Sequence, residues 1–197
     1  MQNILTKTLP TKIQTENGVF EPITDFRASV EFEIMVENGE QDIYTLLHPY
    51  YPKGLPKGNE AAAAEAAIRF YMCGNETKKD EFQPIKRGKR AYSFSVDGEA
   101  IYSDFSRFYN IDLTSESLHW WKFKALLMGL PNDSSFKERI YYRICDLNDL
   151  PKKEKKRIAA IRKEIEIKEK ETSKITLEQR NKQMLDYVTK RSKEMRG

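Results

Sequence analysis

Residues 118–131, LHWWKFKALLMGLP, are apolar on nearly every side of the helix that they would form. A helix without a wide polar face is buried instead of lying on the surface. This segment also contains both tryptophans of the chain. We therefore expect it to be the central helix of a packed core. The side chains that we expect to form this core signature are Leu118, Trp120, Trp121, Phe123, Leu127 and Leu130.

The segment before the tryptophans is amphipathic. A helix that is capped by Asp97 places Ile101, Phe105 and Phe108 on one face. Asp104 falls among polar side chains on the opposite face. The pattern predicts a helix that packs through its aromatic face and turns Asp104 toward solvent.

The segment after the tryptophans repeats this pattern. Asp133 or Ser134 can cap a helix whose apolar face contains Phe136, Ile140 and Ile144. Three consecutive helices that are joined by short turns tend to pack against one another. We expect this bundle to be the core of the protein.

The N-terminal part contains a hairpin signal. Residues 9–23 alternate polar and apolar positions around Asn17-Gly18, two residues that tolerate positive φ. Further helices are expected after Thr24 or Asp25 and after Asn59, the latter because six of the residues 61–67 are alanine, the best helix former. The predicted fold class is mainly α: a helical core bundle with a short N-terminal β-hairpin and a charged C-terminal helical arm.

The character of the chain changes at Pro151. From there on, thin apolar stripes run through a charged background, as in a helical hairpin or a protruding coiled coil. We divide the chain into a core domain, residues 1–150 with the hairpin at about 9–23, and a basic helical arm, residues 151–197. The stripes either contact a partner or pack on each other or on the core. The stripe residues that are candidates for partner contact are Ile158, Ile161, Ile165, Leu177, Met184 and Val188.

The net charge of +4 is unevenly distributed. Residues 151–197 contain 16 Lys and Arg against 8 Asp and Glu, a net charge of +8. The remaining 18 basic and 22 acidic residues give the first 150 residues a net charge of −4. The asymmetry indicates either a polyanion or acidic protein surface as partner, or a helix start that is merely solvated. The candidate basic patch consists of Lys152, Lys153, Lys155, Lys156 and Arg157.

The sequence contains little catalytic chemistry. His48 precedes a proline in a loop, His119 falls within the predicted tryptophan helix, and neither has a second ligand at a metal-binding spacing. Cys73 and Cys145 are too far apart for a redox or zinc motif. Phosphate-binding and nucleophile-elbow motifs are missing. We predict no catalytic residues, no metal and no cofactor, and hence no enzyme.

Membrane insertion and secretion are not expected. The apolar runs are short and interrupted by charges, so none is long enough to span a bilayer. The N-terminus, MQNILTKTLP, lacks the layout of a signal peptide. The prediction is a protein of the cytoplasm.

The motif LHWWKFKALLMGLP, followed by Tyr142-Arg143 and Asp146-Leu147, resembles a family of small proteins from tailed phages and prophages of Gram-positive bacteria. Weaker matches to the same family are Asp25-Phe26-Arg27 and Tyr50-Tyr51-Pro52. The similarity covers roughly residues 8–150, and the arm after Pro151 departs from it.

In that family the gene usually lies between those of the major tail protein and the tape measure protein. The resemblance implies a tail assembly chaperone that binds the tape measure protein and keeps it soluble, alone or with another tail assembly protein. It also implies location in the host cytoplasm and absence from the finished virion. The alternative is a nucleic-acid-associated protein, or a structural head–tail or tail connector, that uses the basic arm.

Overall fold

The computed structural model describes residues 4–6, 8–74, 90–148 and 150–167. This part of the chain is mainly helical, with seven helices and one two-stranded antiparallel hairpin, and it confirms the predicted fold class. The structure divides into two compact units, which are described separately. The described residues of unit 1 are 4–6, 8–74 and 118–123, and those of unit 2 are 90–117, 124–148 and 150–167.

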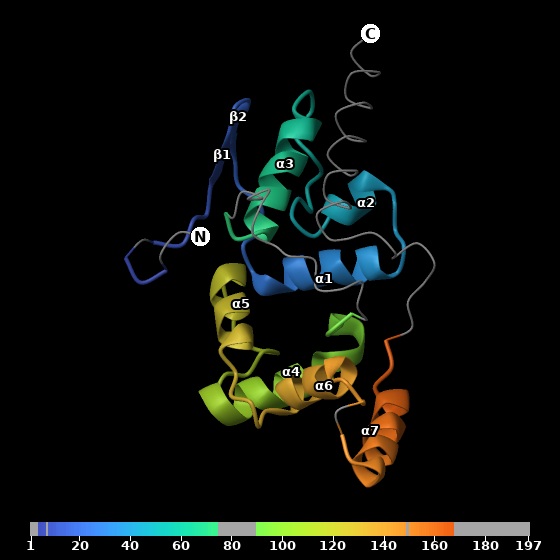
Figure 1. The fold of residues 1–197 in the computed structure, drawn as a ribbon. Helices are drawn as coiled ribbons and strands as arrows, with labels where there is room; N and C mark the ends of the chain where they lie inside the picture. The colour runs from blue at the N-terminus through green and yellow to red at the C-terminus, as the bar shows by residue number, and fades with distance from the viewer. Residues whose placement is uncertain (1–3, 7, 75–89, 149, 168–197) are drawn as a thin grey trace. The chain divides into compact units, whose positions relative to one another are not determined.

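Unit 1 begins with the predicted hairpin, β1 (Ile13–Thr15) and β2 (Gly18–Phe20). Thr15 pairs with Gly18, so the connecting loop is Glu16-Asn17, and Gly18 has the positive φ (139°) that favours glycine. The hairpin lies beside helix α3 (Glu60–Tyr71) (Figure 1). Its inward positions, Ile13 and Phe20, are buried.

Three helices form the rest of this core: α1 (Phe26–Glu37), α2 (Ile43–Leu47) and α3. The side chain of Asp25 accepts a hydrogen bond from the backbone N–H of Arg27, and that of Asp42 accepts one from Thr45, so both carboxylates act as helix caps. Along α3, five of the alanines are buried, which lets neighbouring segments approach its backbone closely.

The tryptophan helix, α5 (Trp120–Met128), begins later than the sequence pattern indicates. Instead of lying inside the helix, His119 precedes it in an isolated β-bridge with Asp25. Two backbone hydrogen bonds hold this bridge, from Phe26 N to Leu118 O (2.8 Å) and from Trp120 N to Thr24 O (2.8 Å). These tertiary bonds occupy backbone groups that a longer helix would use. The first residues of α5 belong to unit 1, and the helix continues into unit 2.

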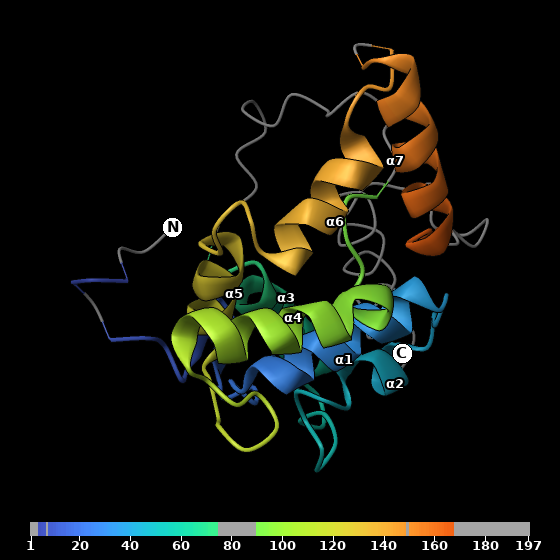
Figure 2. The same cartoon turned by 90° about the horizontal axis from the view of Figure 1, so that it is seen from below.

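Unit 2 contains the rest of α5 with α4 (Phe94–Tyr109), α6 (Ser135–Ile144) and α7 (Lys152–Glu164). Helix α6 packs against both α4 and α7 (Figure 2). The first part of the predicted arm therefore lies against α6 in unit 2. Whether residues 151–197 form a separate arm stays a prediction, because 168–197 lie outside the described residues.

Three predictions about unit 2 are wrong. Asp97 does not cap α4, because the N-cap of this helix is Ser93 and Asp97 lies in its first turn. Asp104 is only 1% exposed, although the pattern placed it toward solvent, and Ile144 is 58% exposed, although the pattern placed it in the core. The buried face of α6 contains Phe136, as predicted, together with Arg143. The reason is electrostatic, because Asp104 and Arg143 each find ionic or backbone partners inside the unit that offset their desolvation.

Candidate functional site

All six side chains of the core signature are buried. The two indole N–H groups have specific acceptors at the end of α3. Trp120 Nε1 donates to Tyr71 O (2.8 Å), and Trp121 Nε1 donates to Phe70 O (2.8 Å). The last carbonyls of a helix have no partner within that helix, so buried ones need an outside donor. Trp120 provides this donor for Tyr71 O, and Trp121 provides a second donor for Phe70 O, which also accepts from Cys73 N (2.9 Å).

His119 orients the start of α5. Its Nδ1 accepts a hydrogen bond from Trp121 N (3.1 Å), and its Nε2 lies 3.0 Å from Pro10 O, an acceptor that requires a proton on Nε2. Burial lowers the pKa of His119 below its usual 6.5, while the Pro10 carbonyl opposes this shift. The neutral Nε2–H form satisfies both contacts, which identifies His119 as a capping residue.

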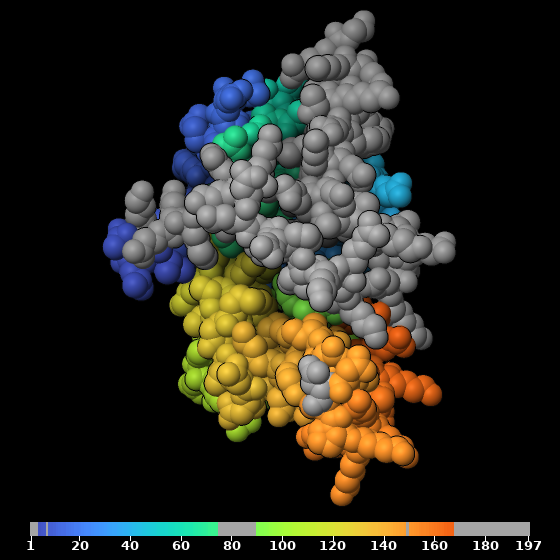
Figure 3. Space-filling view, viewed as in Figure 1, coloured from blue at the N-terminus to red at the C-terminus, as the bar shows by residue number. Residues whose placement is uncertain are grey.

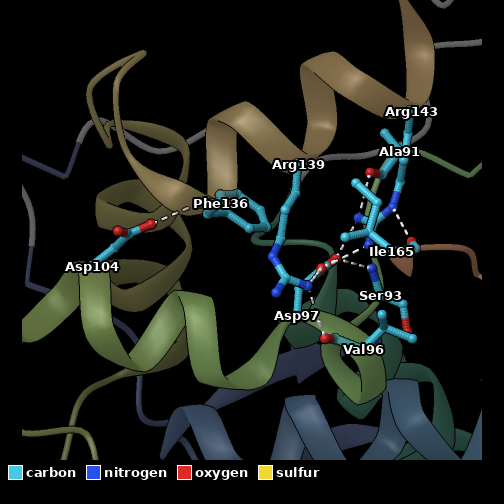
Figure 4. Close-up of polar contacts among 9 residues, drawn as sticks. All are labelled: Ala91, Ser93, Val96, Asp97, Asp104, Phe136, Arg139, Arg143 and Ile165. Atoms are coloured by element: carbon cyan, nitrogen blue, oxygen red, sulfur yellow. Dashed lines mark hydrogen bonds and ion pairs between the residues drawn. The ribbon is translucent and has the colours of Figure 1, made fainter. Parts of the chain in front are cut away.

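A buried ionic network connects α4 to α6 (Figure 4). Arg143 donates to both carboxylate oxygens of Asp97, at 2.6 and 2.8 Å, and Arg139 donates to one of them at 3.2 Å. Asp97 is fully buried, and Arg143 is 6% exposed. Arg143 also donates to Ala91 O (3.1 Å) and Ile165 O (2.9 Å). One guanidinium thus links the entry to α4, helix α6 and the end of α7.

A second carboxylate of α4 holds the opposite end of α6. Asp104 accepts hydrogen bonds from Ser135 N (3.1 Å) and Phe136 N (2.8 Å). Ser134, directly before the helix, accepts from Lys137 N (3.3 Å). A negative charge at a helix N-terminus is favourable because the helix dipole is positive there. Asp97 and Asp104 therefore fix α6 at two points, two helical turns apart on α4.

Sequence reasoning missed this network, although a signal for it exists. Asp97 and Asp104 are seven residues apart, and Arg139 and Arg143 are four apart, so each pair shares a helical face. Both carboxylates are occupied by donors within the protein. The network therefore stabilises the fold of unit 2, and it is not arranged as an open reaction centre.

The candidate basic patch forms the first turns of α7. Lys152, Lys153, Lys156 and Arg157 are exposed, whereas Lys155 is half-buried and donates to Asn148 O (3.1 Å). Long side chains project from the orange surface of α7 in Figure 3. The structure thus brings the predicted cations together on one accessible helix start. What they bind stays a prediction.

The candidate stripe is divided. Ile158 and Ile165 are buried, and Ile161 is half-buried, all within unit 2. Their burial favours the alternative that this half of the stripe packs on its own fold. The other half, Leu177, Met184 and Val188, lies outside the described residues. Partner contact by the stripe stays a prediction.

A groove in unit 1 was not predicted. It has a volume of about 490 Å³ and lies where α1 meets α2. The residues that line it are Glu31, Met35, Tyr44, Thr45, His48 and Pro49. The signal in the sequence is the charge, because residues 28–52 contain five carboxylates and no Lys or Arg.

Neither a cluster of metal ligands nor a membrane-crossing helix is found among the described residues. Nowhere in residues 4–6, 8–74, 90–148 and 150–167 do three or more His, Cys, Asp or Glu side chains gather in a way that would hold a metal ion. Among the helices of the same ranges, none combines the length and the apolar character that crossing a bilayer requires.

Comparison with known proteins gives one match. Residues 5–167 fit the model of a family described as Bacteriophage Gp15 protein. The chain belongs to this family. No curated protein and no solved structure matches it.

The Gp15 family model covers both units and extends through α7. The expectation that the similarity ends near residue 150 is therefore wrong, and only the residues after 167 lie beyond the match. The buried tryptophans and the Asp97–Arg143 pair both fall inside the matched region. The resemblance to a bacteriophage protein family is confirmed at this level.

Proposed function

We propose that this Gp15-family protein is a phage tail assembly chaperone that binds the tape measure protein and keeps it soluble until the tail tube forms around it. The observation that carries the proposal is the family match over residues 5–167, which includes the LHWWKFKALLMGLP motif. The proposed activity is binding without catalysis, in the cytoplasm of the host cell.

The surface of unit 2 supports a binding role. Tyr141 is 50% exposed and Ile144 is 58% exposed, one turn apart on α6. Neighbouring apolar side chains on an exposed helix face can accept the apolar face of a helical client. We therefore assign this α6 strip, Tyr141 and Ile144, as a client contact.

The test is co-expression with the tape measure protein from the same phage, followed by measurement of its soluble fraction and its copurification. We expect the wild-type chain to form a soluble complex with the tape measure protein. The variant Tyr141→Asp/Ile144→Asp should bind the tape measure protein more weakly and should leave less of it soluble. The matched control, Asn132→Asp/Asn148→Asp, adds the same charge at exposed polar positions of unit 2 and should behave as wild type. A tape measure protein that stays insoluble with the wild-type chain would contradict the proposal.

The proposed absence from the virion has its own measurement. Mass spectrometry of purified particles should detect the major tail protein and the tape measure protein without this chain. Stoichiometric recovery of the chain in the particles would instead indicate a structural tail or connector protein.

One observation favours a second candidate function, binding to nucleic acid. Lys152, Lys153, Lys156 and Arg157 form an exposed cluster on α7. Binding through these cations to phosphates would release counterions and would weaken steeply with salt. A DNA titration at several salt concentrations, repeated with all four residues changed to Gln, separates this function from the first. An affinity that does not change with salt eliminates it.

A further inference from the structure

The groove of unit 1 combines an apolar interior with an acidic edge. Met35 and Pro49 are half-buried, and Tyr44 is 39% exposed, so their apolar surface is only partly covered by the described protein. Glu31 and His48 are exposed where they line the same groove. Methionine adapts its shape to different partners, which suits a docking surface.

The charge around the groove has a single sign. Residues 28–52, which cover α2 and all of α1 except Phe26 and Arg27, contain no Lys or Arg. Their five carboxylates are Glu31, Glu33, Glu37, Glu40 and Asp42. Glu33 is buried and accepts a hydrogen bond from the Tyr71 hydroxyl, but Glu31, Glu40 and Asp42 are exposed. A surface of one sign attracts the opposite charge, so an occupant of the groove should be apolar and cationic.

The chain itself contains a segment with these properties. Residues 174–197 hold seven Lys and Arg against three Asp and Glu. In a helix, Leu177, Met184 and Val188 would share one line, and eleven residues would span about 16 Å. This segment follows the last residue of the family match, so it is an addition to the matched region.

We infer that the α1–α2 groove of unit 1 binds the C-terminal segment 174–197 of the same chain. Leu177, Met184 and Val188 cover Met35 and Tyr44, and the Lys and Arg side chains of the segment face the carboxylates of α1 and of the α1–α2 connection. In docking of this kind, an amphipathic helix binds a groove through apolar side chains that are three, four or seven residues apart. The consequence is that the chain shields its own apolar surface.

Hydrogen exchange of the full chain tests the inference. In Met184→Asp/Val188→Asp, backbone amides of α2 and of the second half of α1 should exchange several-fold faster than in wild type, whereas those of α6 should not change. The control Gln179→Asp/Gln183→Asp adds the same charge away from the apolar line and should match wild type. Equal exchange in all three proteins would overturn the inference.

A cross-link identifies the occupant. Thr45 is exposed and lines the groove, so Thr45→Cys/Met184→Cys, in a Cys145→Ser background, should form a disulfide under mild oxidation. The expected product migrates as a monomer on a non-reducing gel at every protein concentration. Covalent dimers that increase with concentration would assign the groove to a second copy instead, and failure to form any disulfide would overturn the docking.

Discussion

The guanidinium of Arg143 and the carboxylate of Asp97 form a bidentate ion pair, with N–O distances of 2.6 and 2.8 Å, between residues 46 positions apart in the sequence. Both side chains are at least nine-tenths buried. The pair therefore makes the packing of α6 on α4 specific, because an apolar neighbour could satisfy neither charge.

Removal of Arg143 should be among the most destabilising single changes in unit 2. Arg143→Met leaves the buried Asp97 carboxylate without its main partner, and such a loss costs about 3–5 kcal/mol. Urea denaturation followed by circular dichroism gives the free energy of unfolding. Arg139→Met is the matched control, because Arg139 is about one-third exposed and contacts Asp97 at 3.2 Å, so it should cost less. An equal loss of unfolding free energy in the two variants would contradict the assignment of Arg143 as the main partner of Asp97.

The cap on α6 makes a second prediction. Asp104→Ala removes the acceptor for the N–H groups of Ser135 and Phe136, and hydrogen bonds to a charged group contribute about 1.5–3 kcal/mol. We expect a loss of about 2 kcal/mol in the free energy of unfolding. Asp133→Ala, an exposed carboxylate near the same helix start, should stay within about 0.5 kcal/mol of wild type. If Asp133→Ala were the more destabilising, the cap would be misassigned.

The tandem tryptophans should be sensitive even to phenylalanine. Trp120→Phe leaves Tyr71 O without its nitrogen donor, whereas after Trp121→Phe the carbonyl of Phe70 still accepts from Cys73 N (2.9 Å), so Trp121→Phe should cost less. The unsatisfied carbonyl of Tyr71 costs about 1–3 kcal/mol in Trp120→Phe, and in both variants the lost ring volume lowers the stability further. Thermal unfolding of each variant measures the effect. Tyr141→Phe, on the exposed face of α6, should leave the midpoint unchanged. A neutral result for both tryptophan variants would show that their hydrogen bonds are dispensable.

His119 should make stability depend on pH in one direction. Because burial lowers its pKa in the folded state, the unfolded chain binds a proton first as the pH falls. The contribution of neutral His119 to the free energy of unfolding is complete above the unfolded-state pKa of about 6.5. It is lost as the pH falls through the lower folded-state pKa. Protonation also removes the Nδ1 acceptor for Trp121 N.

The measurement is the free energy of unfolding at about pH 7.5 and pH 5.5, for wild type and for His119→Asn. Asparagine keeps a capping oxygen but does not titrate, so the variant should lose less stability on acidification. A steeper loss in the variant than in wild type would reverse the sign and refute the assignment.

The sequence by itself determined the features that depend on local order. The 3.6-residue period identified the helices, the Asn17-Gly18 region indicated the hairpin, and the all-round apolar segment indicated burial of both tryptophans. Each of these signals arises from neighbours within a few residues, where backbone preference and side-chain hydrophobicity act together.

The tertiary structure decided where the polar residues belong. Asp104 and Arg143 look like solvent-facing residues until α4 and α6 meet, because a charge can be buried only when a partner from elsewhere in the chain offsets its desolvation. The start of α5 at Trp120 has the same kind of cause, since the bridge between Asp25 and His119 takes the backbone groups that an earlier start would need. The periodicity of a sequence shows which face of a helix is more hydrophobic. It contains no information about a charged partner that lies tens of residues away in the chain.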